Sequence, residues 1–93
     1  MGLYGAQWFA TREFVKSLND RVDWATFVAK DKAERVGYHP TDMSEPKIDW
    51  HVLTEREVEM YRGTGAPIGL DINPGDYLIR VALKVLEDAT VET

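Results

Sequence analysis

The spacing of apolar residues changes along this chain, and that change constrains the possible fold more than any other sequence feature. Between residues 11 and 37, apolar side chains recur at intervals of three and four, the period of one face of an α-helix. From residue 48 onward they alternate with polar side chains, the period of a strand with one buried face. The sequence therefore predicts the α+β class, with two N-terminal helices packed on a small antiparallel sheet that includes a C-terminal β-hairpin.

Two helices are predicted in the first part of the chain. Thr11 caps the first helix, because its hydroxyl can accept a bond from a free amide of the first turn, and Asn19-Asp20 ends it. Asp23 caps the second helix, and Gly37 supplies the left-handed residue that commonly closes one. The predicted apolar stripes are Phe14, Val15, Leu18 and Val22 in the first helix and Ala25, Val28, Ala29, Ala33 and Val36 in the second, widened by Trp24 and Phe27.

Two segments flank these helices. Residues 1–10 form an apolar N-terminal segment with two glycines, and its sequence does not decide whether it docks on the core or packs against another chain. Residues 38–47 contain two prolines and clustered small polar residues, which predicts a loop. Loops of this length often carry function.

A strand and a short helix are predicted next. Ile48, Trp50 and Val52 alternate with polar residues, which predicts a strand with one buried face. Thr54 followed three residues later by Glu57 has the form of a capping box, which favours a helix over residues 55–62. The rival interpretation is a strand, because Val58 and Met60 also alternate; the capping box favours the helix.

The end of the chain carries the predicted hairpin. Apolar residues alternate over 68–72 and again over 77–85, and the four residues 73–76 between them, Asn-Pro-Gly-Asp, have strong turn chemistry. In the competing interpretation Asn73 caps a helix that begins at Pro74. The β-branched content favours strands. Residues 89–93 are predicted to be a frayed tail.

The composition suits a single domain over residues 1–93. The chain is 44% hydrophobic with ten aromatic residues, which is enough apolar material for one core. It contains no cysteine, so disulfides and thiolate metal sites are excluded and a reducing compartment is favoured. No signal peptide pattern and no apolar run long enough to cross a bilayer occur. We therefore expect a cytoplasmic protein without a membrane partner.

The formal charge of −5 is unevenly placed. Residues 1–37 hold six basic groups and five acids, whereas residues 38–93 hold five basic groups and eleven acids. We therefore do not expect the second half to bind nucleic acid, because phosphate backbones attract basic faces. The alternative of a nucleic-acid-binding protein would use the basic residues of the N-terminal helices, which are Arg12, Lys16, Arg21, Lys30, Lys32 and Arg35.

Catalytic signatures are missing from the sequence. It has no glycine-rich phosphate loop, no dinucleotide fingerprint, no metalloprotease helix and no nucleophile elbow, so neither a catalytic residue nor a cofactor is predicted. A divalent-metal-binding protein or metal-dependent enzyme is one alternative. Asp49 and His51 share a strand face, and His39 lies in the loop before it. Imidazole and carboxylate groups together can hold zinc or a related ion. The sequence favours ordinary surface histidines.

The remaining aromatic residues suggest a binding role. Trp8, Tyr38 and Tyr61 lie outside the clean apolar stripes, and aromatic side chains often anchor protein interfaces. The sequence therefore favours a small non-enzymatic protein-interaction module, such as an adaptor, inhibitor or assembly factor. Its partner would be another protein or a second copy of the chain. Three acids, Glu55, Glu57 and Glu59, would set its electrostatic preference.

Overall fold

The computed structural model describes residues 2–85, apart from the side chains of residues 41–45. The predicted tail at 89–93 lies outside the described residues. In chain order the elements are β1 (Gly2–Ala10), α1 (Arg12–Lys16), α2 (Arg21–Arg35), β2 (Pro40–Val52), α3 (Glu55–Gly63) and β3 (Tyr77–Val85). Helices combined with an antiparallel three-stranded sheet confirm the α+β class.

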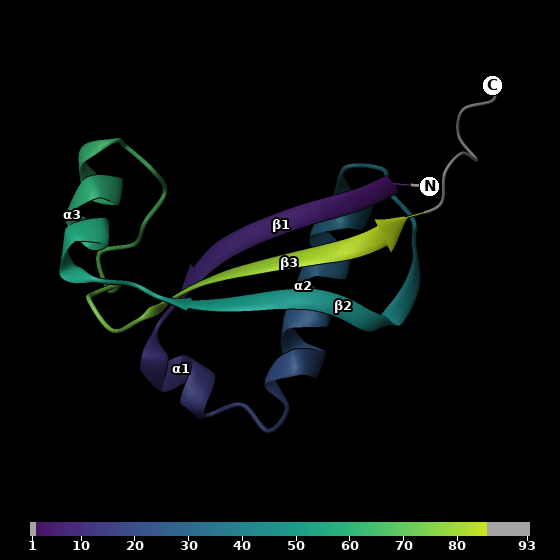
Figure 1. The fold of residues 1–93 in the computed structure, drawn as a ribbon, viewed down its shortest axis with the longest axis horizontal. Coiled ribbons are helices and arrows are strands. Elements are labelled where there is room, and N and C mark those ends of the chain that lie inside the picture. The colour runs from purple at the N-terminus through teal and green to yellow at the C-terminus, as the bar shows by residue number, and fades with distance from the viewer. Residues whose placement is uncertain (1, 86–93) are drawn as a thin grey trace.

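The last strand of the chain occupies the middle of the sheet. The strand order is β1-β3-β2, and both neighbours of β3 run antiparallel to it (Figure 1). Along β1, the register pairs Gly2 with Val85 at one end and Ala10 with Tyr77 at the other. Because β3 supplies the pairing for both outer strands, the sheet is completed only when this C-terminal strand is in place.

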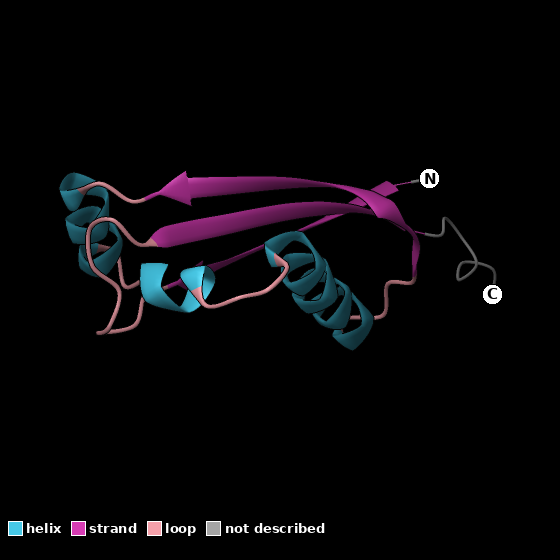
Figure 2. Cartoon of the chain, turned by 90° about the horizontal axis from the view of Figure 1, so that it is seen from below, coloured by secondary structure: helices cyan, strands magenta, loops and turns pink. Residues whose placement is uncertain are grey.

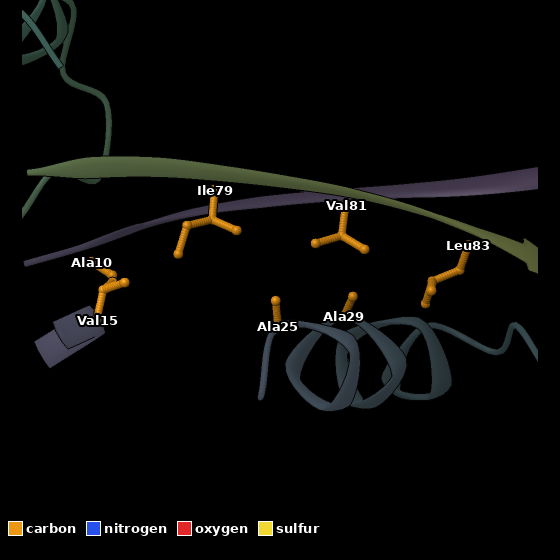
Figure 3. Packing of buried hydrophobic residues seen from close by; sticks show 7 residues of the cluster. All are labelled: Ala10, Val15, Ala25, Ala29, Ile79, Val81 and Leu83. Atoms are coloured by element: carbon orange, nitrogen blue, oxygen red, sulfur yellow. The ribbon is translucent and has the colours of Figure 1, made fainter. Parts of the chain in front are cut away.

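Helices α1 and α2 lie on the same face of the sheet (Figure 2). The side of α2 that meets the sheet is a stripe of alanines, and Ala25, Ala29 and Ala33 are fully buried at a spacing of four. Small side chains let the helix approach the strands closely, as Figure 3 shows for Ala25 and Ala29 beneath β3. The buried residues of this first cluster are Ala10, Val15, Ala25, Ala29, Ile79, Val81 and Leu83. Among the described residues, no helix is both long and apolar enough to cross a membrane.

A second, smaller cluster lies at the α3 end of the sheet. Leu78 alternates with Ile79 along β3, so its side chain emerges on the face opposite α2. There it joins a buried group that α3 covers, consisting of Leu53, Val58, Ile72 and Leu78. Phe9 and Tyr61 pack against this group from β1 and α3. The single strand β3 therefore carries both clusters, one on each face.

The predicted cap of α1 and the predicted end of α2 are confirmed, whereas α1 ends at Lys16, earlier than the Asn19-Asp20 pair that was predicted to end it. The Thr11 hydroxyl accepts the Phe14 amide at 3.1 Å at the start of α1. At the end of α2, Gly37 has φ +92°, and the amide of Tyr38 bonds the Ala33 carbonyl at 3.0 Å, the geometry of a Schellman motif. The helix over 55–62 is confirmed as α3, with its capping box formed.

The predicted cap of α2 was wrong by one turn. The cap is Asp20, whose carboxylate accepts the amide of Asp23 at 3.0 Å, so Asp23 belongs to the first turn. Because the helix begins earlier than predicted, Val22 falls in α2 and is 53% exposed. Phe27 and Val36, predicted as part of the buried stripe, are exposed, since the alanine side of α2 faces the sheet.

The predicted C-terminal hairpin does not form. Residues 77–85 are a strand, but residues 68–72 lie in the loop between α3 and β3. The alternating apolar residues of this loop do not share one buried face, because Ile72 is buried in the second cluster while Leu70 is almost fully exposed. Both edges of β3 are instead taken by β1 and β2, which come from elsewhere in the chain. The turn at 73–76 is present, closed by the Asp76 amide on the Asn73 carbonyl at 3.0 Å.

The predicted loop at 38–47 is mostly strand. Strand β2 begins at Pro40, and its register against β3 shifts twice, between Pro40 and Asp42 and between Asp42 and Lys47. Prolines are tolerated at the start and the free edge of a sheet, and bulges absorb extra residues. The prolines and polar residues that indicated a loop therefore belong to the irregular part of an edge strand.

The apolar N-terminal segment is strand β1, which docks on the core. Its alternate residues point to opposite faces. Ala6 and Trp8 pack towards α2, while Phe9 packs on the second cluster. Because both faces carry apolar side chains, the strand shows no apolar–polar alternation, and this explains why its sequence does not identify it.

Candidate functional site: a groove along the edge of β1

The two outer strands of the sheet are protected differently against pairing with another chain. β2 has two prolines, Pro40 and Pro46, charged residues such as Lys47 and Asp49, and two register irregularities. These are the usual devices that prevent edge-to-edge association. β1 has none of them, because its nine residues include no charge and no proline and its register runs without a shift. Among the described residues, the outer edge of β1 is unpaired, and it carries none of these protecting features.

This unprotected edge lies along a groove of about 760 Å³. Five consecutive residues, 7–11, line it, so both faces of the strand contribute. On one side lie Phe14 of α1 with Trp24 and Lys32 of α2. On the other side lie Tyr61 of α3 and the loop that follows α3. The loop residues that line the groove are Ala66, Pro67, Gly69, Asp71 and Ile72.

Aromatic rings dominate both sides of the groove. Towards α2, the Trp24 ring centre lies 5.8 Å from Trp8 and 5.2 Å from Phe14, both in edge-to-face geometry. On the opposite face, Phe9 and Tyr61 are 5.4 Å apart, also edge to face. Such pairs are favourable beyond their buried area and hold each other's orientation. The groove therefore offers two rigid aromatic groups, one on each face of β1.

A few polar groups border these rings. The Lys32 ammonium lies 5.8 Å from the centre of the Trp8 ring, within cation–π distance. The indole Nε1 of Trp8 is buried and has no hydrogen-bond partner among the described residues. The Asp71 carboxylate lies on the other side, where a side chain at Gly69 would collide with it, since a Cβ there would come within 2.6 Å of Asp71 Oδ1. The lining thus carries one cation and one anion.

Hydrogen bonds tie the loop beyond α3 to both sides of the groove. The Arg62 guanidinium donates to the Ile72 carbonyl, which holds the loop against α3. The Asp76 carboxylate accepts the Asn73 amide and the Arg12 amide, each at 2.7 Å. The second bond joins the turn before β3 to the first residue of α1. These bonds fix the position of the loop and the turn relative to α3 and α1.

The structure brings together two of the three predicted aromatic contacts. Trp8 and Tyr61, far apart in the sequence, both line the groove. Tyr38 lies elsewhere, 45% exposed with its ring 5.2 Å from Tyr4 at the other end of β1. Sequence reasoning assigned Phe14 and Trp24 to the core, whereas both line the groove. The signal that could have indicated the edge was the absence of charge in residues 2–10.

None of the three predicted acidic contacts, Glu55, Glu57 and Glu59, lines the groove. Glu57 accepts the Thr54 amide at 2.9 Å and contacts His51 Nε2 at 2.9 Å, so it has a structural role. The Thr54 amide, followed by the bond to His51, lowers the pKa of the Glu57 carboxyl below its ordinary value. Glu55 and Glu59 are exposed on α3 and do not line the groove.

The candidate metal ligands do not come together. Asp49 forms an ion pair with Arg80 across the strands at 3.1 Å. His51 bonds Glu57 instead of Asp49, and His39 is exposed before β2 begins. Within residues 2–40 and 46–85, no cluster of three or more histidine, aspartate or glutamate side chains could hold a metal ion.

Several basic residues of the N-terminal helices have local partners. Arg35 pairs with Asp31 one turn earlier on α2 at 2.9 Å. The Arg21 guanidinium lies 5.8 Å from the Trp50 ring, as Lys32 does from Trp8. These contacts spread the positive charges over separate sites on α2.

Comparisons of this chain with protein-family models, with curated proteins and with solved structures find no match. Two features distinguish this surface, an edge strand without charge or proline and an aromatic groove beside that edge.

Proposed function

We propose that this chain is a small non-enzymatic protein-interaction module, an adaptor, inhibitor or assembly factor, which binds an extended polypeptide segment along β1. One observation carries the proposal. The unprotected edge of β1 lies in an aromatic groove, whereas the other edge of the same sheet is blocked by prolines, charges and bulges.

The backbone of β1 supports binding by strand addition. In the part of the chain that the structure describes, the strand has one neighbour, β3, so at alternate residues the amide and carbonyl groups point away from the sheet. An extended segment laid along this edge takes up those hydrogen bonds, and this mode of recognition is common among peptide-binding domains. The hydrogen bonds supply affinity that does not depend on the partner's sequence.

The aromatic groups beside the edge supply selectivity. Side chains of an added strand point alternately to the two faces, so one set meets Trp8, Trp24 and Phe14 and the other meets Phe9 and Tyr61. Aromatic residues in such positions carry much of the binding energy of protein interfaces. The preferred segment is therefore extended and apolar on both faces.

The acidic side chains outside the groove have a secondary role in this proposal. Glu55 and Glu59 are exposed on α3, and residues 38–93 carry eleven acids against five basic groups. Exposed charges at the periphery of a contact change the association rate more than the affinity. We therefore expect Glu55 and Glu59 to affect how fast a charged partner associates and to contribute little to the affinity.

Site-specific photo-crosslinking tests the proposal. A photoreactive phenylalanine analogue replaces Phe14, which lines the groove and is 44% exposed, or Phe27, which is 68% exposed on α2 and does not line the groove. In extract from the native cell, we expect a polypeptide adduct from position 14 and none from position 27. Equal labelling from both positions, or adducts from position 27 alone, would contradict a partner site in the groove.

A further inference from the structure

We propose that the segment in the groove is strand β1 of a second copy of this chain, paired antiparallel about a two-fold axis through Ala6. This inference rests on the proposed function and names its partner. The product is a dimer with a continuous six-stranded sheet, in which α2 of each copy lies on the same face. A two-fold contact of this kind is self-complementary, so one strand must supply both the site and the ligand.

The two halves of β1 are complementary in this way. Residues 7–10 line the groove, whereas residues 2–5 lie beyond its end. The far half nevertheless carries a large apolar side chain, Leu3, which is 66% exposed. One end of the strand therefore lies in an apolar groove, and the other end presents an exposed apolar side chain.

The register follows from the length of the strand. Centring the pair on Ala6 places Gly2 opposite Ala10 of the second copy and uses all nine residues of β1. Leu3 then meets Phe9 of the second copy, and Tyr4 meets Trp8. Opposed residues of antiparallel strands share a face, so Leu3 joins the Phe9–Tyr61 pair and Tyr4 joins the Trp8–Trp24 pair.

The chemistry of β1 favours this pairing over repulsion. The chain has a net charge of −5, but its nine β1 residues are uncharged, so no like charges are placed opposite each other along the strands. At the centre, Gly5 lies opposite Gln7 of the second copy, and its lack of a side chain leaves room for the glutamine. Because the two-fold axis relates the two copies, the groove of each copy is filled by the strand of the other when the dimer forms.

Solution mass measurements with two variants at one position test the dimer. A Cβ added at Gly5 meets nothing within 4 Å, so the monomer tolerates substitution there. Gly5→Lys places two cations near each other across the axis, and we expect it to raise the dimer dissociation constant about tenfold or more. Gly5→Thr adds a side chain without charge and should keep the dimer. Far-UV circular dichroism verifies that both variants fold.

Disulfide trapping tests the register, and the absence of cysteine from the chain makes the experiment clean. Gly5→Cys and Gln7→Cys are prepared separately, mixed and oxidised. Directly opposed residues have a Cα separation that suits a disulfide. We therefore expect the mixed disulfide to exceed both homodisulfides. A pairing centred on position 5 or on position 7 would instead favour the homodisulfide of that variant, which would overturn the register.

The outcomes separate this inference from the proposed function. A doubled mass that is lost in Gly5→Lys, together with the mixed disulfide, supports the second copy as occupant. A monomer that still labels a foreign polypeptide from position 14 overturns the second copy and leaves the interaction module standing. A monomer without any adduct overturns both. A dimer that Gly5→Lys leaves unchanged places the contact elsewhere and overturns the inference.

Discussion

At the scale of single residues, Glu57 links the start of α3 to strand β2. Its carboxylate caps the backbone at the start of α3 through Thr54 and also holds His51, which lies on β2. The same residue was expected to meet a partner, because its sequence position next to Glu55 and Glu59 resembles an exposed acidic surface. A side chain that satisfies two groups of its own chain is less available for recognition.

Removing the cap of α3 should destabilise the protein. Thr54→Ala loses the hydroxyl that accepts the Glu57 amide at 3.1 Å. We expect the free energy of unfolding to fall by about 1 kcal/mol, the usual cost of losing such a cap. Urea denaturation measures the change. Thr54→Ser keeps the hydroxyl and serves as the control, so an equal loss in both variants would rule out the cap as the cause.

The contribution of Glu57 should depend on pH. Its pKa is lower in the folded protein, first because of the Thr54 amide and then because of His51, so the ionised carboxylate stabilises the fold. This contribution is present above the ordinary glutamate pKa of about 4.3 and is lost as pH falls through the lower folded value. Glu57→Gln should therefore be less stable than the parent at pH 7, with the difference shrinking under acid.

Thermal unfolding at several pH values measures this difference. The control is Glu59→Gln, because Glu59 is exposed on the same helix and lies outside the bonds to Thr54 and His51. A stability difference for Glu57→Gln that stays constant down to pH 2 would show that the carboxylate charge is not responsible.

At the scale of elements, the ends of the helices follow local chemistry. Thr11, Asp20 and Thr54 each accept an amide of the first turn, and Gly37 adopts the positive φ that closes α2. These interactions involve residues within four positions of each other. The sequence therefore predicts each helix end either correctly or with an error of about one turn.

Two glycines at helix ends should respond to alanine in opposite directions. Gly37 has φ +92°, where alanine is strained, so Gly37→Ala should lower stability by about 1 kcal/mol. Gly63 is the last residue of α3, is not among the glycines of positive φ, and has open space at its Cβ position. Gly63→Ala should therefore stabilise the protein by about 0.4–1 kcal/mol.

Chemical denaturation of the two variants side by side measures these changes, and each serves as the other's control. A loss of stability in both would indicate that alanine disturbs packing at either site, and would remove backbone conformation as the explanation.

At the scale of the whole molecule, β3 connects everything else. It pairs with both outer strands, and its alternate side chains enter the two apolar clusters, with Ile79 on the α2 side and Leu78 on the α3 side. Ile79 is fully buried and opposed by Trp8 on one neighbour and Trp50 on the other. Because both clusters share one strand, we expect them to unfold together.

Truncating Ile79 tests this connection. Ile79→Ala should cost about 2–5 kcal/mol, a large part of the roughly 5–15 kcal/mol that stabilises a domain. Ile79→Val should cost about 0.5–1.5 kcal/mol. Tryptophan fluorescence follows the α2 side, far-UV circular dichroism follows the whole chain, and the two unfolding curves should coincide. Separate transitions would show that the clusters unfold independently.

The candidate site was only partly visible in the sequence. Trp8 and Tyr61 could be singled out, because neither fits an apolar stripe. The sequence could not show that the two residues lie close together, since they are 53 positions apart and meet only through the pairing of β1 with β3 and the packing of α3. Phe14 and Trp24 fit a helical stripe and were assigned to the core for that reason. A stripe does not distinguish a ring that is covered from one that borders a groove.

By itself the sequence determined the helix caps at Thr11 and Thr54, the turn at 73–76, the strand character of residues 48–52 and 77–85 and the α+β class, because these follow from contacts among near neighbours. Only the tertiary structure decided that residues 2–10 are a strand, that residues 68–72 are not, and which strands pair. Strand pairing is a competition between distant segments for the two edges of β3. The local spacing of apolar residues does not show which segment wins each edge. The unprotected outer edge of β1 exists only because β1 pairs with β3 on its other side.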